Sequence, residues 1–186
     1  MDIGDNDALL GRLRSYTPRS PIEAADVRAV ISLAEGDRPW SRSSPVHVTG
    51  SALIVHPPSR RVLLRWHERQ NGWLQVGGHA DPGEDDPLAV AMREGAEETG
   101  LDDLRPWPTA DLQHVVVVQV PANDREPAHQ HADLRFLLAT DQPERARPEA
   151  QSAPLRWLSV DDALQLAGED NVREVIKTAG ELFQEQ

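Results

Sequence analysis

The chain has 186 residues, a formal net charge of −12, an isoelectric point near 4.9 and no cysteine. This length suits one domain with a short extension, and disulfides and thiol nucleophiles are excluded. The acidic balance argues against binding to nucleic acid, whose phosphates attract basic surfaces. The sequence has neither a secretory leader pattern nor an apolar run of membrane length. We therefore expect a cytoplasmic protein without a nucleic-acid or membrane partner.

The first 45 residues predict a helical extension. Ser20 is a good N-cap, Pro21 suits the first helical position, and Glu23 would complete a capping box. A polar, turn-rich segment then ends the extension, so we divide the chain into 1–45 and a main domain over 46–186. The extension packs either on the main domain or on a partner, and a homodimer through it is one expectation.

The main domain alternates strand patterns with helix patterns. Runs of β-branched and alternating apolar residues predict six strands, over 46–55, 61–66, 72–76, 112–120, 132–140 and 155–158. Helical spacing of apolar residues predicts one helix after residue 86, one after residue 159 and a closing one over 171–183. Strands before and after a central helix predict an α/β sandwich with a mixed sheet.

The central helix carries the most chemistry. Asp86 can cap it, and Glu94, Glu97 and Glu98 stand at i, i+3 and i+4, so three carboxylates share one face. Crowded carboxylates favour a hard divalent cation such as Mg²⁺. The diglycine Gly77-Gly78 in front of the helix predicts a turn that exposes carbonyl groups at close range. An acid-rich solvated helix face is the alternative reading, which the glycines and a nearby Arg-Glu pair disfavour.

The same stretch resembles the signature of Nudix hydrolases. The matching residues are Gly78, Glu84, Arg93, Glu94, Glu97, Glu98, Gly100 and Leu101. The resemblance implies a Nudix-type α/β/α sandwich and hydrolysis, with Mg²⁺ or Mn²⁺, of a nucleoside diphosphate linked to another group. Two departures stand out: eight residues separate Glu84 from Arg93 where seven are usual, and Gly95 replaces an aliphatic residue. An extra loop residue is well tolerated, so the helix face is kept.

The resemblance also implies roles for individual residues. Its metal ligands would be the Gly77 carbonyl, Glu94, Glu97 and Glu98. Glu84 and Arg93 would support them, and Arg93 is spaced to pair with Glu97 or with Glu84. Either Glu97 or Glu94 would act as general base, and the sequence leaves that choice open.

Histidines form a second group of candidates. His129, His131 and Asp133 alternate, so on a strand they would face one side, and with His79 and His114 they are candidates to contact substrate. A similar His-x-His stretch and a Gly-Gly-His signature start mark a little-characterised subset of Nudix proteins that the chain resembles. The readings that stay open are contact with substrate phosphates, an extra metal ligand, a two-histidine zinc site, or a polar strand without special role.

The expected function is hydrolysis of a pyrophosphate bond in a small nucleotide substrate. Two alternatives stay open: a sanitising hydrolase of damaged nucleoside triphosphates, and a nucleotide-binding regulator without turnover. The intact set of glutamates favours an enzyme over the regulator. The sequence does not identify the substrate.

Overall fold

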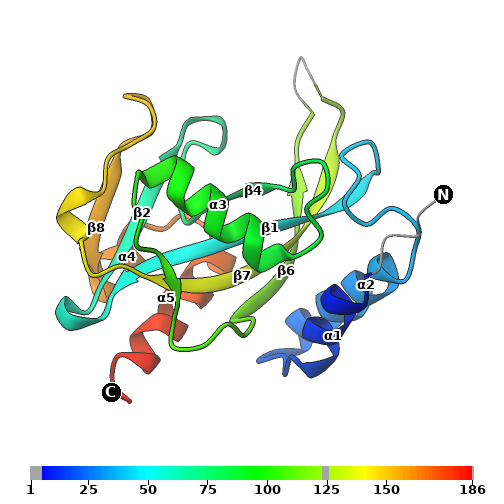
Figure 1. Ribbon diagram of the computed structural model, residues 1–186, viewed down its shortest axis with the longest axis horizontal. Helices are drawn as coiled ribbons and strands as arrows, with labels where there is room; N and C mark the ends of the chain where they lie inside the picture. Colours follow the sequence, from blue (N-terminus) through cyan, green and yellow to red (C-terminus); the bar gives the residue numbers. More distant parts are fainter. Residues whose placement is uncertain (1–5, 123–125, 186) are drawn as a thin grey trace.

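An eight-stranded mixed sheet forms the centre of the protein (Figure 1). The structure is a computed structural model that describes residues 6–122 and 126–185. The main path of the sheet runs β3-β2-β1-β7-β5, while β4 pairs with β1, β6 with β7 and β8 with β2. The strands are β1 (Val46–His56), β2 (Arg61–His67), β3 (Gly72–Leu74), β4 (Val76–His79), β5 (Arg105–Pro106), β6 (His114–Val120), β7 (His129–Ala139) and β8 (Leu155–Ser159). Only the pair β1–β7 is parallel among the described pairings.

Helices cover both faces of this sheet (Figure 1). They are α1 (Asp7–Ser15), α2 (Pro21–Ala34), α3 (Pro87–Thr99), α4 (Val160–Leu166) and α5 (Asp170–Leu182). The central strand β1 divides its side chains between two apolar clusters, as a strand's period of two requires. Ala52 and Ile54 pack in the cluster that includes Ala91 of α3, whereas Leu53 and Val55 pack with α4 and α5. The predicted α/β sandwich with a mixed sheet is therefore confirmed.

The N-terminal helices α1 and α2 pack on the main domain, one of the two alternatives. They contribute to the same apolar cluster as the α3 face of the sheet. Two acidic side chains of α2 also bind backbone amides of β6, which pairs only with β7 among the described strands. Glu23 accepts a hydrogen bond from the Val115 amide at 3.1 Å, and Asp26 accepts one from Val117 at 3.2 Å. These bonds satisfy amides of a strand edge that would otherwise remain open.

The capping box predicted for α2 is only half present. Ser20 accepts a hydrogen bond from the Glu23 amide as expected. The Glu23 carboxylate, however, binds the Tyr16 hydroxyl at 2.6 Å, the Arg19 amide and the β6 edge. Through these contacts, the buried Glu23 carboxylate holds α2 on the sheet.

The boundary after residue 45 and the homodimer both stay predictions. Among the described residues, no helix is both long and apolar enough to cross a membrane.

Candidate active site

The helix α3 begins and ends as its sequence predicts. Asp86 accepts a hydrogen bond from the Leu88 amide at 3.1 Å, and Gly100 adopts φ +66° at the C-cap, where glycine is favoured. The helix lies close to β1 because Gly50 lacks a side chain: a Cβ there would stand 3.0 Å from Cβ of Val90. Val90 and Ala91 of α3 are fully buried, and the acidic face lies against β4, where Glu98 binds the Gly77 amide.

The diglycine lies in strand β4 rather than in a turn, contrary to the prediction. Gly77 pairs with Ser51 and Gly78 with Gly50 of β1. Gly77 has φ +152°, and a Cβ on it would lie 2.6 Å from Ser51. A Cβ on Gly78 would lie 2.8 Å from Oε2 of Glu94. The two glycines are thus required by close approach, to β1 on one side and to the acidic helix on the other.

Arg93 connects the loop glutamate to the acidic face. Its guanidinium donates two hydrogen bonds of 2.9 Å to the carboxylate of Glu84, one to Glu94 at 2.9 Å and one to Glu97 at 3.2 Å. It also donates to the His79 carbonyl at 2.8 Å. Both partners considered from the sequence, Glu84 and Glu97, are bound at once. The hydrogen bonds from Arg93 and the Asp81 amide outweigh partial burial and lower the pKa of Glu84.

The three glutamates differ in their surroundings. Glu98 accepts a hydrogen bond from the Gly77 amide at 3.1 Å and lies 3.3 Å from Arg65. Burial raises the pKa of Glu98 to about 7 and also raises the pKa of Glu94, although neighbouring cations oppose both shifts. The Glu97 side chain is 58% exposed, against 17% for Glu94.

These surroundings fit a divalent cation. The raised pKa values of Glu94 and Glu98 mean that nearby arginines do not fully compensate two partly buried carboxylates. An ion with oxygen ligands would supply the missing charge, and Mg²⁺ is the typical choice for such carboxylates. The roles implied for Gly77, Glu94, Glu97 and Glu98 as ligands stay predictions.

Three of the five residues expected to contact substrate come together. His79, His129 and His131 meet at one end of the sheet, together with a fourth member, His47 on β1, which was not predicted from the sequence. Each of the four rings offers one nitrogen, and these nitrogens lie within 4.8 Å of one another. Burial and neighbouring histidines lower the pKa of His79 to about 3 and that of His131 to about 4, so both rings are neutral at pH 7. The pairing of His47 with His131 across β1 and β7 is the signal that could have revealed it.

His114 and Asp133 lie elsewhere on the same face. Asp133 is buried and accepts hydrogen bonds from Thr49, Ser51 and Arg135 at 2.6–2.9 Å, which engage its carboxylate inside the sheet. His114 on β6 is also buried and lies 4.0 Å from Glu23, and burial lowers its pKa to about 4. Neither residue belongs to the group of four histidines.

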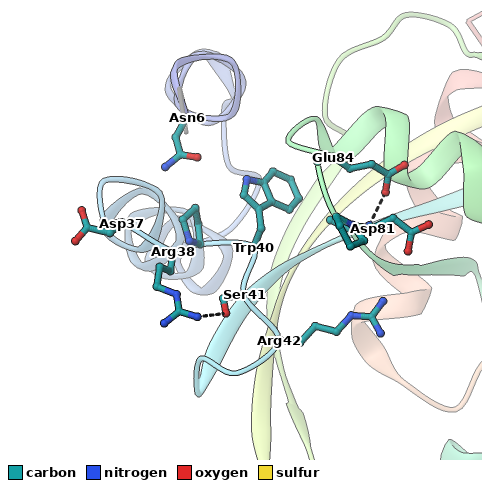
Figure 2. A pocket seen from close by; sticks show the side chains of 12 residues that line it. Asn6, Asp37, Arg38, Trp40, Ser41, Arg42, Asp81 and Glu84 are labelled. Atoms are coloured by element: carbon teal, nitrogen blue, oxygen red, sulfur yellow. Dashed lines mark hydrogen bonds between the residues drawn. The ribbon is translucent and has the colours of Figure 1, made fainter. Parts of the chain in front are cut away.

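A cavity of about 680 Å³ lies beside the loop that carries Glu84. Figure 2 shows Trp40 standing between the N-terminal helices and this loop, with Arg38 and Arg42 nearby. The Trp40 indole nitrogen is buried and has no hydrogen-bond partner among the described residues. The cavity therefore offers an aromatic ring and two cations close to the acidic helix.

The sandwich and the acidic helix agree with the fold and the site expected from the sequence. The NUDIX domain model matches residues 46–179, which is more than half of the chain. The protein therefore belongs to the Nudix family and is a hydrolase acting on phosphorus anhydrides.

Individual relatives agree with this assignment. A protein of Lactococcus lactis subsp. cremoris (strain MG1363), named as a probable DHNTP pyrophosphohydrolase, is 28% identical over 120 residues, which cover 63% of this chain and 67% of the relative. A C. elegans Ap4A hydrolase in a binary complex superposes with a TM-score of 0.59 at 17% identity, over 75% of this chain and 98% of its own. The E. coli dihydroneopterin triphosphate pyrophosphohydrolase gives 0.53 at 20% identity, over 72% and 93%. At these identities, the two structures support the fold alone.

Proposed function

We propose that the protein is a metal-dependent pyrophosphohydrolase that cleaves a nucleoside diphosphate linked to another group. The observation that carries the proposal is the acidic face of α3, where Arg93 ties Glu84 to Glu94 and Glu97 while Glu98 is bound to the Gly77 amide. A regulator without turnover would have no need for this full set of carboxylates.

The residues divide into holding and reacting groups. Glu94, Glu98 and the Gly77 carbonyl would hold the cation, because the two carboxylates are partly buried and nearby arginines do not fully compensate their charge. When bound, Mg²⁺ or Mn²⁺ neutralises charge on the phosphate oxygens and lowers the pKa of a coordinated water. Glu97 is the most exposed of the three glutamates, and among the described residues its side chain accepts one hydrogen bond, from Arg93 at 3.2 Å. It is therefore the carboxylate most accessible to an attacking water, and we assign it as the general base.

The proposed reaction has one displacement at phosphorus. Glu97 accepts a proton from the attacking water, whose oxygen forms a bond to phosphorus while the bond to the bridging oxygen breaks. The bridging oxygen leaves with the second phosphate group. Arg93 fixes Glu97 and Glu94 relative to each other, and the bidentate Glu84 pair holds Arg93 in turn.

The cavity beside Glu84 supports a nucleotide-sized substrate. Its volume of about 680 Å³ is in the range of small-molecule sites. Trp40 could stack on a base, and Arg38 and Arg42 could pair with phosphates in an otherwise acidic protein.

A second candidate substrate is a triphosphate, which the sanitising alternative also requires. It is favoured by the 28% identical relative, which is named as a probable DHNTP pyrophosphohydrolase. Hydrolysis of a triphosphate would use the same glutamates, so the two candidates differ only in the group that enters the cavity.

A substrate panel tests the proposal. The full-length protein is incubated with dinucleoside polyphosphates, nucleotide sugars, nucleoside triphosphates and dihydroneopterin triphosphate, with Mg²⁺, Mn²⁺ or chelator. We expect at least one member to be cleaved at a pyrophosphate bond only when metal is present. Cleavage of triphosphates alone would move the assignment to the second candidate. Absence of turnover on every member, with intact binding of nucleotide, would support the regulator instead.

A further inference from the structure

We infer that His47, His79, His129 and His131 form a second metal site that binds one first-row divalent transition ion, with Zn²⁺ the preferred occupant. This group is called the histidine tetrad below. The tetrad lies at the end of the sheet where β1, β4 and β7 meet, outside the acidic face of α3. The inference does not depend on the proposed hydrolysis, because its test measures bound metal.

The pairing of three strands brings the four rings together. His47 of β1 is opposite His131 of β7, and His79 of β4 is opposite Thr49, two residues further along β1. His129 is two residues before His131 on β7. Residues paired across strands, or two apart on one strand, face the same side of a sheet. All four rings therefore lie on one face, at the strand ends.

The distances are close to those of a tetrahedral site. Nε2 of His131 lies 3.1 Å from Nε2 of His79 and 3.1 Å from Nε2 of His129. Tetrahedral Zn²⁺ with bonds of 2.0–2.1 Å requires ligand nitrogens about 3.3–3.4 Å apart. All four nitrogens lie within 4.8 Å, so small rotations of the rings would complete the geometry.

Backbone carbonyls orient two of the rings as ligands. Nδ1 of His47 lies 3.1 Å from the Ser44 carbonyl, and Nδ1 of His129 lies 2.9 Å from the Pro127 carbonyl. Because a carbonyl oxygen only accepts, each Nδ1 must carry the proton, and each Nε2 of a neutral ring then presents a lone pair to the tetrad. A hydrogen bond from Nδ1 to a carbonyl is the usual arrangement behind a metal-bound histidine.

The four nitrogens carry too few protons to satisfy one another by hydrogen bonds. Nε2 of His131 can carry at most one proton, yet it faces two other nitrogens at 3.1 Å. Nε2 of His47 has no hydrogen-bond partner among the described residues, and the His47 residue is only 2% exposed. A buried, unpaired acceptor is costly, and a cation at the centre would satisfy all four nitrogens.

The chemistry of the tetrad selects the kind of occupant. Imidazole nitrogens suit Zn²⁺ and its neighbours in the first transition row, whereas Mg²⁺ prefers oxygen. Inward lone pairs would repel phosphate oxygens, so the tetrad does not suit substrate phosphates. Four protein ligands leave no open position, which is the pattern of a structural site.

The tetrad has both a route to solvent and a connection to the active site. A cavity of about 360 Å³, lined in part by Arg42, His47, His79 and His129, gives the ion an entry path. The carbonyl of His79 accepts the 2.8 Å hydrogen bond from Arg93. An ion bound to the His79 ring would therefore fix the end of β4 next to the two glycines and Arg93.

The test measures Zn²⁺ binding to the metal-free, full-length protein against a chromogenic chelator, in millimolar Mg²⁺ to occupy the carboxylates. We expect one tightly bound Zn²⁺ per chain and an affinity at least about 100-fold lower in His131→Ala. His56→Ala is the matched control, since His56 lies at the far end of β1 and is bonded to Ser59. It should bind Zn²⁺ like the wild type, and so should Glu97→Gln.

Co²⁺ in place of Zn²⁺ gives an independent readout, because tetrahedral Co²⁺ absorbs visible light strongly. The band should appear in the wild type and be lost in His131→Ala. If His131→Ala does not fold, His129→Ala at the start of β7 decides the same question. Equal Zn²⁺ affinity in wild type and tetrad variant, or displacement of Zn²⁺ by millimolar Mg²⁺, would overturn the inference.

Discussion

Replacing Gly78 by alanine should damage the acidic face without changing any charge. Gly78 is not among the glycines with positive φ, so alanine needs no left-handed backbone there. Its Cβ, however, would stand 2.5 Å from the Glu94 carboxyl carbon, where ordinary contact begins near 3.4 Å. The carboxyl group would have to move by about 0.9 Å and would strain its 2.9 Å bond to Arg93.

The structure sets the size of the expected effect. A misplacement of about 1 Å in a catalytic arrangement can cost on the order of 100-fold in rate, which is about 2.7 kcal/mol of activation free energy. We therefore expect kcat of Gly78→Ala to fall by about 100-fold, and the Mg²⁺ concentration needed for half-maximal rate to rise. Steady-state hydrolysis of the best panel substrate, with Mg²⁺ varied, measures both quantities.

Gly95→Ala is the matched control on the helix itself. A Cβ at Gly95 would meet Cδ1 of Leu104 at 3.0 Å, which is the end of a flexible side chain and not a catalytic group. Alanine also favours the helix by about 1 kcal/mol. We expect wild-type kcat for Gly95→Ala. A folded Gly78→Ala variant that keeps wild-type kcat and Mg²⁺ dependence would refute the placement of Glu94 in the catalytic arrangement.

Three further predictions concern the extension and the arginine partners. Burial is the larger cause, and the Glu23 carboxylate the second, that raises the pKa of the Tyr16 hydroxyl above 10.0. The folded state therefore favours the neutral hydroxyl, and the stability gained in this way is complete below pH 10 and is lost as the pH rises above 10. Because Tyr16 is the only tyrosine, tyrosinate absorbance should appear at a higher pH in the folded wild type than in Glu23→Gln. Coincident titrations of the two proteins would contradict the buried pair. Arg12→Met should lower the free energy of unfolding in urea by about 1 kcal/mol, because it removes the partly exposed ion pair with Asp86 at the start of α3. An unchanged urea midpoint would argue against that role. Glu84→Gln should lower kcat by about 10-fold or more, because the amide has a single oxygen and its NH2 group cannot accept the second hydrogen bond from the guanidinium. The same steady-state assay checks it, and unchanged kcat would exclude a supporting role.

Much of the fold could be predicted because its signals are local. The caps of α3, Asp86 and Gly100, act over a few residues, and the apolar periods of strands and helices need no partner to be recognised. The short strand β5 was missed, since two residues carry no period. The early start of β7 at His129 was missed because its polar residues do not have a strand composition.

The site residues that were missed or misread depend on distant partners. His47 joins the tetrad only through the parallel pairing of β1 with β7, across a separation of 84 residues to His131. Glu23 has the sequence of a capping residue, but the Val115 amide of β6 and the Tyr16 hydroxyl bind its carboxylate instead. Gly77 lies in a strand because it pairs with Ser51 of β1, and Ser51 comes close enough to exclude a side chain at Gly77. Such contacts arise from tertiary packing and leave no trace in local propensity.

The central claim is that the acidic face of α3 carries out metal-dependent hydrolysis, and Glu97→Gln tests it most directly. The matched control is Glu174→Gln, since Glu174 is also a helical glutamate about half exposed, at 54% against 58%, with a cationic partner in Lys177. With the best panel substrate and saturating Mg²⁺, kcat should fall by about 100-fold or more in Glu97→Gln, as for loss of a general base, and stay at the wild-type value in Glu174→Gln. Equal kcat in the wild type and Glu97→Gln would contradict the assignment of Glu97 as the proton acceptor.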